Sequence, residues 1–297
     1  MASILIIGST GMLGSAVTKF LSQSTNTIIE SNTSGRSIIP ENSCVKFDIE
    51  KQEVEELFVS NLGKPDFIVN CSGLIKHKIN PSDVQSVKSA YKVNSVFPKA
   101  LSDFCKSFDT KIIQIATDCV FTGSAGKYLE DSPHDAADTY GVSKSQGEVL
   151  AENLMILRCS VIGRELSSHV ELTDWILGQE VDSKLKGFTN HFWNGLTTFH
   201  FAKVVSGIIE VGSFRSGIFH VLPKDSVSKF ELIGAICTSF NRKDITVEAV
   251  EAETFVDRRL DTKFPENNNE FWRLAGYDKP LGILEMIAEY SNWVRAE

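Results

Sequence analysis

The sequence predicts an α/β protein with a doubly wound parallel sheet and a smaller C-terminal α/β lobe. Short apolar segments alternate with amphipathic stretches over the first half of the chain, a glycine-rich turn follows the first apolar segment, and the alternation ends after Gly163. Alternation of strands and helices is typical of a parallel sheet covered by helices on both faces. The break after Gly163 indicates a second, differently built region.

The expected elements follow from these patterns in chain order. Buried strands of four to six residues are expected at Ser3–Ile7, Thr27–Ser31, Cys44–Phe47, Phe67–Asn70, Lys111–Ala116 and Met155–Arg158. Amphipathic helices are expected near Leu13–Ser22, Val54–Leu62, Val84–Phe108 and Ser143–Leu154. Residues 164–187 are mixed helical material, and Gly217–Val221 is expected to form one more strand. Helices at Ser228–Phe240 and Leu281–Val294 flank a less regular, charge-rich stretch.

The composition limits the classes of protein. The chain has 297 residues, 42% hydrophobic and 23% charged, which is close to the globular average. Its 30 basic and 38 acidic residues give a net charge of −8, which argues against nucleic acid as a partner. The six cysteines form neither a CxxC pair nor a pattern typical of zinc or disulfides. No apolar run approaches the roughly 18 residues of a membrane span, so we expect a soluble, cytoplasmic protein without membrane contact.

The glycine-rich turn is the first candidate site. Gly8, Gly11 and Gly14 follow the first strand and open the first helix, where a Rossmann-type domain needs a tight turn, a close backbone approach to pyrophosphate and close helix packing. The spacing is GxxGxxG rather than GxGxxG, and an ordinary strand–helix turn is the alternative. We assign the turn to a dinucleotide cofactor, and we include its residues Thr10, Met12 and Leu13.

The end of the second strand indicates which dinucleotide binds. A site for NAD places an acid about 20 residues after the glycines, but residues 31–36 contain none and end in Arg36. A guanidinium suits the 2′-phosphate of NADP, so NADPH is favoured. NAD is left open, because Glu30 takes the acid's role if the strand ends earlier. Asp48, with Ile49 beside it, is a candidate for the adenine; a helix N-cap is the alternative for Asp48.

A tyrosine and a lysine four residues apart are the candidates for chemistry. Tyr140 and Lys144 share one face of an expected helix, and Thr117 stands at the carboxyl end of a central strand, where ligands bind in open α/β sheets. Reduction of a ketone requires a proton donor at the oxygen. We expect the ammonium of Lys144 to lower the pKa of the Tyr140 phenol, and the Thr117 hydroxyl to hydrogen-bond the same oxygen. A surface pair on a helix is the alternative.

Four segments resemble the extended short-chain dehydrogenase/reductase family: GSTGMLG at 8–14, NCSG at 70–73, ATDCVFTG at 116–123 and YGVSKSQGE at 140–148. Within it, the segments 117–123 and 190–198 resemble dTDP-4-dehydrorhamnose reductases and related sugar-nucleotide reductases. The resemblance implies that Thr117, Tyr140 and Lys144 are catalytic, and that residues 70–73, with Cys71, Ser72 and Gly73, line the cofactor ribose. It places Cys159 to Ile162 near the nicotinamide and makes Asn94 a structural asparagine. Some members bind magnesium at a dimer interface; no matching acid cluster is found here, so we expect no metal, and a homodimer stays open.

The substrate side is expected to need local positive charge. Lys76, followed by His77 and Lys78, and the pair Arg258 and Arg259 are candidates for a diphosphate, with solvated surface charges as the alternative. Trp193 and Asn194 either line the sugar or pack a hinge. Asp118, Val120 and Phe121, in the segment after Thr117, are assigned to the substrate as well. The histidines His134, His169, His200 and His220 are expected to be structural.

These observations favour NADPH-dependent reduction of a nucleotide-linked 4-keto-6-deoxyhexose. Related 4,6-dehydratases have a glutamate after Thr-Asp, where this chain has Cys119, so dehydration is not expected. Two alternatives stay open: a nucleotide-sugar epimerase, and a non-catalytic NADP-binding subunit like that of methionine adenosyltransferase. We expect residues 1–163 and 188–225 to form the cofactor domain, and 164–187 and 226–297 to form the substrate lobe.

Overall fold

A parallel sheet organises the larger part of the molecule in the computed structural model, which describes residues 1–58 and 63–296. Its strand order is β11-β6-β5-β4-β1-β2-β3, and every neighbouring pair is parallel. The order reverses between β1 and β4, so the expected doubly wound sheet is confirmed. The strands are β1 (Ser3–Ile7), β2 (Thr27–Asn32), β3 (Ser43–Lys46), β4 (Phe67–Asn70), β5 (Lys111–Ala116), β6 (Leu154–Arg158) and β11 (Gly217–His220).

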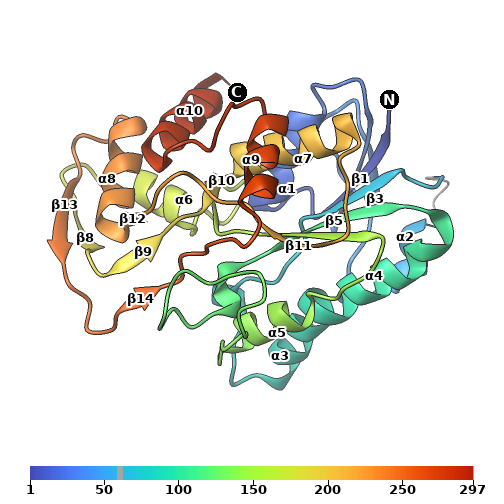
Figure 1. The fold of residues 1–297 in the computed structure, drawn as a ribbon, viewed down its shortest axis with the longest axis horizontal. Helices are drawn as coiled ribbons and strands as arrows, with labels where there is room; N and C mark the ends of the chain where they lie inside the picture. Colours follow the sequence, from blue (N-terminus) through green and yellow to red (C-terminus); the bar gives the residue numbers. More distant parts are fainter. Residues whose placement is uncertain (59–62, 297) are drawn as a thin grey trace.

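Helices cover both faces of this sheet because its strands are apolar on both sides. In β1, Ile4 and Ile6 pack into one core, whereas Leu5 and Ile7 pack into another. Residues of α1 (Met12–Leu21), α7 (Thr198–Val211) and α9 (Pro265–Leu274) join the first core. The other face carries α2 (Val54–Phe58), α3 (Val84–Tyr91), α4 (Phe97–Cys105) and α5 (Thr139–Gln146); in Figure 1, α3, α4 and α5 lie in the lower part and α2 at the right.

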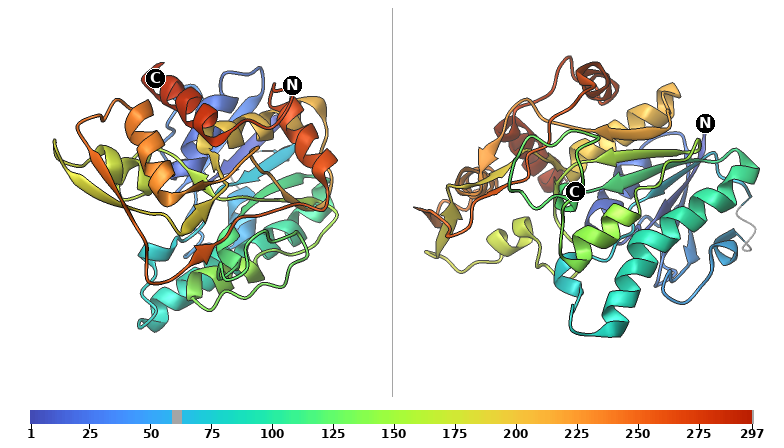
Figure 2. Two further views of the ribbon diagram at one scale, coloured as in Figure 1. Left: turned by 60° about the vertical axis from the view of Figure 1, so that its left-hand side comes forward. Right: turned by 60° about the horizontal axis from the view of Figure 1, so that its bottom comes forward.

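One long helical segment crosses that second face (Figure 2, right). It is made of α3, a π-helical turn at Lys92–Val96 and α4, and a 3₁₀ turn at Lys106–Phe108 ends it. The expected helix Val84–Phe108 therefore forms throughout its length. Asp83 starts it, because its carboxylate accepts hydrogen bonds from the backbone N–H groups of Gln85 and Ser86.

The lobe lies at the left of Figure 1 and contains short sheets. β8 (Lys184–Phe188) pairs with β13 (Thr246–Val250), and β9 (His191–Trp193) lies between β12 (Val227–Ser228) and β14 (Val256–Asp257). Helices α6 (Leu172–Leu177) and α8 (Lys229–Ser239) pack beside them, and α10 (Ile283–Ala296) ends the described chain. A further short pair, β7 (Val161–Ile162) with β10 (Leu196–Thr197), joins the two halves of the chain.

Several expected elements differ from the observed ones. The helix expected at Ser143–Leu154 is α5, which starts at Thr139 because Asp138 caps it there. It ends at Gln146. The stretch expected to be irregular before Leu281 contains α9, and α7 was not expected. Residues 59–62 of the helix expected at Val54–Leu62 lie outside the described residues. β9 falls within the range 188–225 assigned to the cofactor domain, yet it pairs with β12 and β14 of the lobe.

None of the helices in the described ranges is long and apolar enough to cross a membrane.

Candidate active site

A cleft with a volume of about 640 Å³ lies at the carboxyl ends of the central strands. Its walls come from the residues that follow β1, β4, β5 and β6, together with α5 and the segment 165–171 of the lobe. The cleft brings together many of the residues that the sequence singled out: Thr10, Gly11, Met12, Leu13, Cys71, Ser72, Gly73, Lys76, Thr117, Asp118, Tyr140, Lys144 and Cys159. Segments that are far apart in the chain thus meet at the end of the sheet where ligands bind in this architecture.

The glycine turn has the shape that a dinucleotide requires. Gly8 has a φ of +78°, and a Cβ on Gly14 would stand 2.0 Å from the Gly8 carbonyl oxygen. The backbone N–H of Gly11 donates to the Gly8 carbonyl at 3.0 Å, and Gly11 is the N-cap of α1 without a side chain to bond the first amides. The first amides of a ten-residue helix therefore face the cleft without a side-chain cap, which fits a pyrophosphate.

The side chains of Thr117, Tyr140 and Lys144 line the same cleft. Asp138 accepts a hydrogen bond from the Gly141 backbone N–H at 3.0 Å, which fixes the first turn of α5 and so the place of Tyr140. Lys144 lies one turn later and donates from Nζ to the Ile115 carbonyl at 3.3 Å. Thr117 follows β5 directly; its Oγ1 accepts from the Cys119 backbone N–H at 3.1 Å and donates to Asp118 Oδ1 at 3.2 Å.

Burial dominates the ionisation of these groups. It raises the pKa of the Tyr140 phenol far above the ordinary value, and interaction with the Thr117 side chain opposes that rise only in part. The same desolvation lowers the pKa of the Lys144 ammonium. We expected Lys144 to lower the pKa of the Tyr140 phenol, but burial raises that pKa instead, so the phenol keeps its proton. A protonated phenol is the form that donates a proton.

Asn94 holds the loop after β4 in place. Its Oδ1 accepts from the Leu74 backbone N–H at 2.8 Å, and its Nδ2 donates to the Leu74 carbonyl at 2.9 Å and to Ser143 Oγ at 3.0 Å. The residue lies in the π-helical turn and is 2% exposed, so all of its polar atoms are used inside the protein. A Cβ on Gly73 would stand 3.6 Å from Asn94 Oδ1 and 3.8 Å from Lys144 Nζ, so this loop passes close to the lysine.

The loop after β2 distinguishes between the two candidates for the ribose. The Glu30 side chain is fully buried, and its carboxylate accepts from the Ile38 and Ile39 backbone N–H groups at 2.9 and 3.1 Å, and from Ser37 and Asn42. It therefore has no exposed edge for a ribose hydroxyl. Arg36 is exposed, and no described residue forms an ion pair with it. The structure thus removes the main argument for NAD.

Asp48 belongs to a turn rather than to a helix cap. Its carboxylate accepts from the Glu50 backbone N–H at 3.1 Å and from Lys51 Nζ at 2.8 Å, and the hydrogen bond from Lys51 is the main cause of its lowered pKa. The helix α2 starts only at Val54, so the N-cap alternative is wrong. Arg36, Asp48 and Ile49 lie outside the lining of the cleft, on the half of the sheet that carries β2 and β3.

The two adjacent arginines of the lobe have different surroundings. Arg259 forms a two-point ion pair with Asp257, with Nε–Oδ1 at 2.8 Å and Nη2–Oδ2 at 2.6 Å, and its guanidinium lies over the Phe192 ring. The substrate role expected for Arg259 is therefore not supported, because its charge is already paired. Arg258 donates from Nε to the Phe121 carbonyl at 2.9 Å. Burial raises the pKa of Asp118, and the charge of Arg258 opposes that rise only in part.

Four other candidates for the substrate side are outside the lining of the cleft. Trp193 is buried and donates from Nε1 to Ser160 Oγ at 2.9 Å, and Asn194 bonds the Leu260 backbone through both of its side-chain polar atoms. These contacts favour the packing alternative for both. Val120 and Phe121 are fully buried, and Phe121 stacks on Tyr128 at 4.1 Å between ring centroids. They are therefore core residues rather than cleft residues.

Most of the histidines have partners within the fold. His134 and His220 bond the buried Arg158 at 3.0 and 2.7 Å, and His220 Nδ1 donates to the Asp261 carbonyl at 2.6 Å. His200 is buried between Thr197 and Glu289. These contacts agree with structural roles, and among the described residues no group of three or more His, Cys, Asp or Glu side chains has the arrangement of a metal site.

Sequence reasoning missed two charged residues on the lobe side. Glu171, the N-cap of α6, lines the cleft and lies 3.5 Å from His77 between carboxylate and ring nitrogen. Lys229, the first residue of α8, exerts its charge on Asp118, Cys119 and Glu171, all of which line the cleft. No local pattern marks either residue, because tertiary contacts alone bring them to the site.

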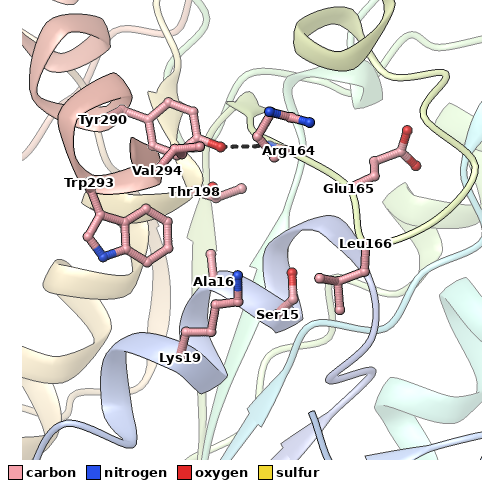
Figure 3. A pocket seen from close by; sticks show the side chains of 10 residues that line it. All are labelled: Ser15, Ala16, Lys19, Arg164, Glu165, Leu166, Thr198, Tyr290, Trp293 and Val294. Carbon is pink, nitrogen blue, oxygen red and sulfur yellow. Dashed lines mark hydrogen bonds between the residues drawn. The ribbon is translucent and has the colours of Figure 1, made fainter. Parts of the chain in front are cut away.

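A second hollow, of about 200 Å³, lies beside α1 and shares Glu165 and Leu166 with the cleft. Figure 3 shows it between Ser15, Ala16 and Lys19 of α1 and Tyr290 and Trp293 of α10. Tyr290 accepts a hydrogen bond from the Arg164 backbone N–H at 2.6 Å, so α10 is tied to the segment that leads from β7 into the lobe.

One family model matches most of the chain, and relatives of two kinds resemble it. The family model described as the RmlD substrate binding domain matches residues 1–263. A dTDP-4-dehydrorhamnose reductase from Aggregatibacter actinomycetemcomitans is 25% identical over 100% of this chain and 97% of its own. The methionine adenosyltransferase 2 subunit beta of Rattus norvegicus is 26% identical over 80% of this chain and 72% of its own.

The solved structures show the shared fold. The dTDP-4-dehydrorhamnose reductase of Bacillus anthracis in complex with NADP aligns with a TM-score of 0.75 over 100% of both chains, at 19% identity. The dTDP-glucose 4,6-dehydratase of Bacillus anthracis in complex with NAD aligns with a TM-score of 0.71 over 100% of this chain and 97% of its own, at 18% identity.

Proposed function

This chain belongs to the RmlD substrate binding domain family, and from that premise we propose that it is an NADPH-dependent reductase of a nucleotide-linked 4-keto-6-deoxyhexose. The observation that carries the proposal is the meeting of Thr117, Tyr140 and Lys144 with an uncapped glycine turn in one cleft. The relatives named dTDP-4-dehydrorhamnose reductase support the substrate class.

In the proposed reaction the C4 carbonyl of the sugar becomes an alcohol. NADPH, when bound, supplies the hydride for the carbon. Tyr140 donates its phenolic proton to the carbonyl oxygen, and its raised pKa means that the proton is present at neutral pH. The Thr117 hydroxyl hydrogen-bonds the same oxygen and fixes its position. Lys144, one helical turn from Tyr140, lies where its ammonium stabilises the phenolate that remains until a solvent proton replaces the lost one.

The cofactor contacts are part of the same proposal. The glycine turn, with Gly8, Gly11 and Gly14, receives the pyrophosphate, and the loop at Cys71, Ser72 and Gly73 lines the ribose beside Lys144. Arg36 receives the 2′-phosphate, because it is exposed in the loop after β2 while Glu30 is enclosed. Cys159 lies in the cleft near the place of the nicotinamide. The proposal also divides the chain into a cofactor domain and a lobe that holds the nucleotide sugar, with β9 counted in the lobe.

Turnover of defined sugars tests the function. Purified protein is incubated with dTDP- or UDP-linked 4-keto-6-deoxyhexoses and NADPH, and loss of absorbance at the NADPH band is compared with product formed. We expect equal amounts of NADPH oxidised and alcohol produced, and no conversion of dTDP- or UDP-hexoses unless a dehydratase is added. Keto sugar formed by this protein alone indicates a dehydratase, and conversion without net NADPH oxidation indicates an epimerase; either result contradicts the proposal.

A non-catalytic role is the second candidate, because the beta subunits of methionine adenosyltransferase 2 match 80% of this chain. The same assay separates the two. A protein that binds NADPH but oxidises none with any of these keto sugars favours a binding role, whereas stoichiometric oxidation excludes a purely non-catalytic one.

A further inference from the structure

A buried arginine at the end of β6 has partners for all of its donors. Arg158 is the last residue of that strand and is fully buried. Its Nε donates to Glu148 Oε1 at 3.1 Å, and its Nη2 donates to Glu148 Oε2 and to His134 Nε2, the latter at 3.0 Å. Its Nη1 donates to His220 Nε2 at 2.7 Å and to the Glu130 carbonyl at 3.4 Å. A guanidinium has five N–H groups, so these five bonds fill its capacity.

Two of these partners connect Arg158 with α5. Glu148 stands four residues after Lys144, just beyond the helix, and its side chain is 4% exposed. His134 belongs to the segment between β5 and α5, and its Nδ1 bonds Ser145 Oγ at 2.7 Å. Arg158 therefore reaches the C-terminal end of α5 in two ways, directly through Glu148 and indirectly through His134.

The same arginine lies beside the strand that leads to the third proposed catalytic residue. In the parallel pair of β5 and β6, Arg158 is the register partner of Ala116, and Thr117 follows Ala116 directly. Tyr140 and Lys144 come from α5, which is a separate element. One side chain thus bonds the helix that carries two of the proposed catalytic groups, and it starts from the strand next to the third.

The link through His134 requires a neutral imidazole ring. A guanidinium can only donate, so His134 Nε2 accepts from Arg158, and the ring proton lies on Nδ1 and is donated to Ser145 Oγ. Protonation of the ring would set a second N–H group against the Arg158 N–H and break this link. Burial is the main cause of the lowered pKa of His134, and the charge of Arg158 adds to it. The carboxylates of Glu148 and Asp135 oppose this shift only in part, so the neutral form is present at pH 7.

We propose that Arg158 is a positioning residue: through Glu148 and a neutral His134, it holds α5 in a fixed position relative to the end of β5. A buried ion pair adds little net stability, because desolvation of the two charges offsets their attraction, whereas its directed bonds fix the geometry of the groups that they join. Small displacements of catalytic groups lower turnover strongly. The inference rests on the proposed function, since only there do Tyr140 and Lys144 act on a substrate.

Removal of the whole ion pair tests the positioning role. Arg158→Met alone would leave the Glu148 carboxylate buried without a cation, so the variant is Arg158→Met/Glu148→Leu, which removes both charges and is expected to fold. We expect its kcat for the keto sugar to fall about 10- to 100-fold. Its Kd for NADPH should change little, because the glycine turn follows a different strand, β1. The matched control is Arg242→Met/Asp244→Leu, which removes another arginine bound to a carboxylate at two points, outside the cleft, and should keep kcat.

Variants of His134 test the requirement for a neutral ring, and they also decide if the double variant does not fold. In His134→Gln the amide can accept from Arg158 through Oε1 and donate to Ser145 through Nε2, and it does not titrate. We expect His134→Gln to keep kcat near the wild-type value at pH 7 and to lose less of it at pH 5 than the wild type. His134→Leu, which makes neither bond, should lower kcat at both values. An equal acid loss in His134→Gln and the wild type, or a normal kcat in His134→Leu, contradicts the inference.

Amide hydrogen exchange in α5 separates this inference from the proposed function, because it needs no turnover. At one pH and below the melting temperature, the amides of α5 should exchange faster in Arg158→Met/Glu148→Leu than in the wild type, and at the wild-type rate in the Arg242→Met/Asp244→Leu control. A first double variant with wild-type kcat, or with wild-type exchange in α5, overturns the inference. Faster exchange in α5, in a chain whose wild type reduces none of the keto sugars, contradicts only the proposed function.

Discussion

The cofactor side and the lobe side of the cleft differ in how their polar groups are satisfied. On the cofactor side, Asn94, Asn70 and Glu30 are buried and have all their main bonding partners inside the protein. On the lobe side, Lys229 and the Nη atoms of Arg258 have no hydrogen-bond partners among the described residues. The buried groups that shape the cofactor side are thus satisfied within the protein, and that side leaves the first amides of α1 and the Arg36 side chain for a ligand. On the lobe side, side-chain cations themselves are left without hydrogen-bond partners among the described residues.

The largest effect is expected on the cofactor side, at Tyr140. If it donates the proton, Tyr140→Phe should lower kcat by about 10²–10⁴-fold, the usual contribution of general acid catalysis, while NADPH binding persists. The measurement pairs steady-state turnover with a fluorescence titration of NADPH. Near-normal turnover of the variant would show that another group protonates the product and would break the assignment of chemistry to this side.

Substitution of Arg36, but not of Glu30, is expected to change the preference for NADPH over NADH. Arg36→Ala should remove most of the preference for NADPH over NADH, because a charge-assisted bond to phosphate contributes about 1.5–3 kcal/mol. Glu30→Gln should lower the Tm without changing that preference, since the carboxylate bonds only the loop that follows β2. The measurement is the ratio of the dissociation constants of NADH and NADPH for each variant and for the wild type. A preference that changes in Glu30→Gln but not in Arg36→Ala would reverse the two assignments.

An effect on stability alone, and none on the chemistry of the cleft, is expected at His220 of β11. Burial, with the charge of Arg158, lowers the pKa of His220 from 6.5 to about 4, while its Nδ1 bonds the Asp261 carbonyl. As the pH falls, His220 is therefore protonated in the unfolded state before it is protonated in the folded state. The free energy of unfolding that His220 contributes is lost between about pH 6.5 and pH 4. One unit of this difference corresponds to about 1.4 kcal/mol.

Melting curves at pH 7 and pH 5 measure that contribution. We expect His220→Gln to lose fewer degrees of Tm between the two values than the wild type, because the glutamine does not titrate. Equal losses in both proteins would mean that other groups control the acid sensitivity of the fold.

The sequence predicts one side of the cleft far better than the other, for a physical reason. The glycine turn, Thr117, and the pair Tyr140 and Lys144 act through local geometry, namely a turn, a strand end and one helical turn, and local geometry can be inferred from spacing. All of the expected strands form, with bounds that differ by one residue at most. The resemblance to the short-chain dehydrogenase/reductase family is also confirmed by the family match.

The lobe side could not be predicted in the same way. Arg258 and Arg259 are indistinguishable as neighbours in a sequence, and only the tertiary contact with Asp257 separates a paired arginine from one with unused donors. Lys229 has no local pattern at all, because its surroundings come from Asp118 and Glu171 in other segments. The helix α9 was missed for a different reason: most of its residues have charged or amide side chains, so few apolar residues mark it in the sequence.

The π-helical turn at Lys92–Val96 has a consequence for how this chain can vary. A π turn is a regular helix with one extra residue, so deleting a single residue there should leave a continuous α-helix rather than a broken one. The π turn takes up the extra residue locally, so the deletion would shift the residues of the turn relative to the helix on either side of it. Asn94, which lies in the turn, could then no longer bond both Leu74 and Ser143. Natural insertions and deletions in this family should therefore be tolerated in many loops but avoided at this one point of a helix.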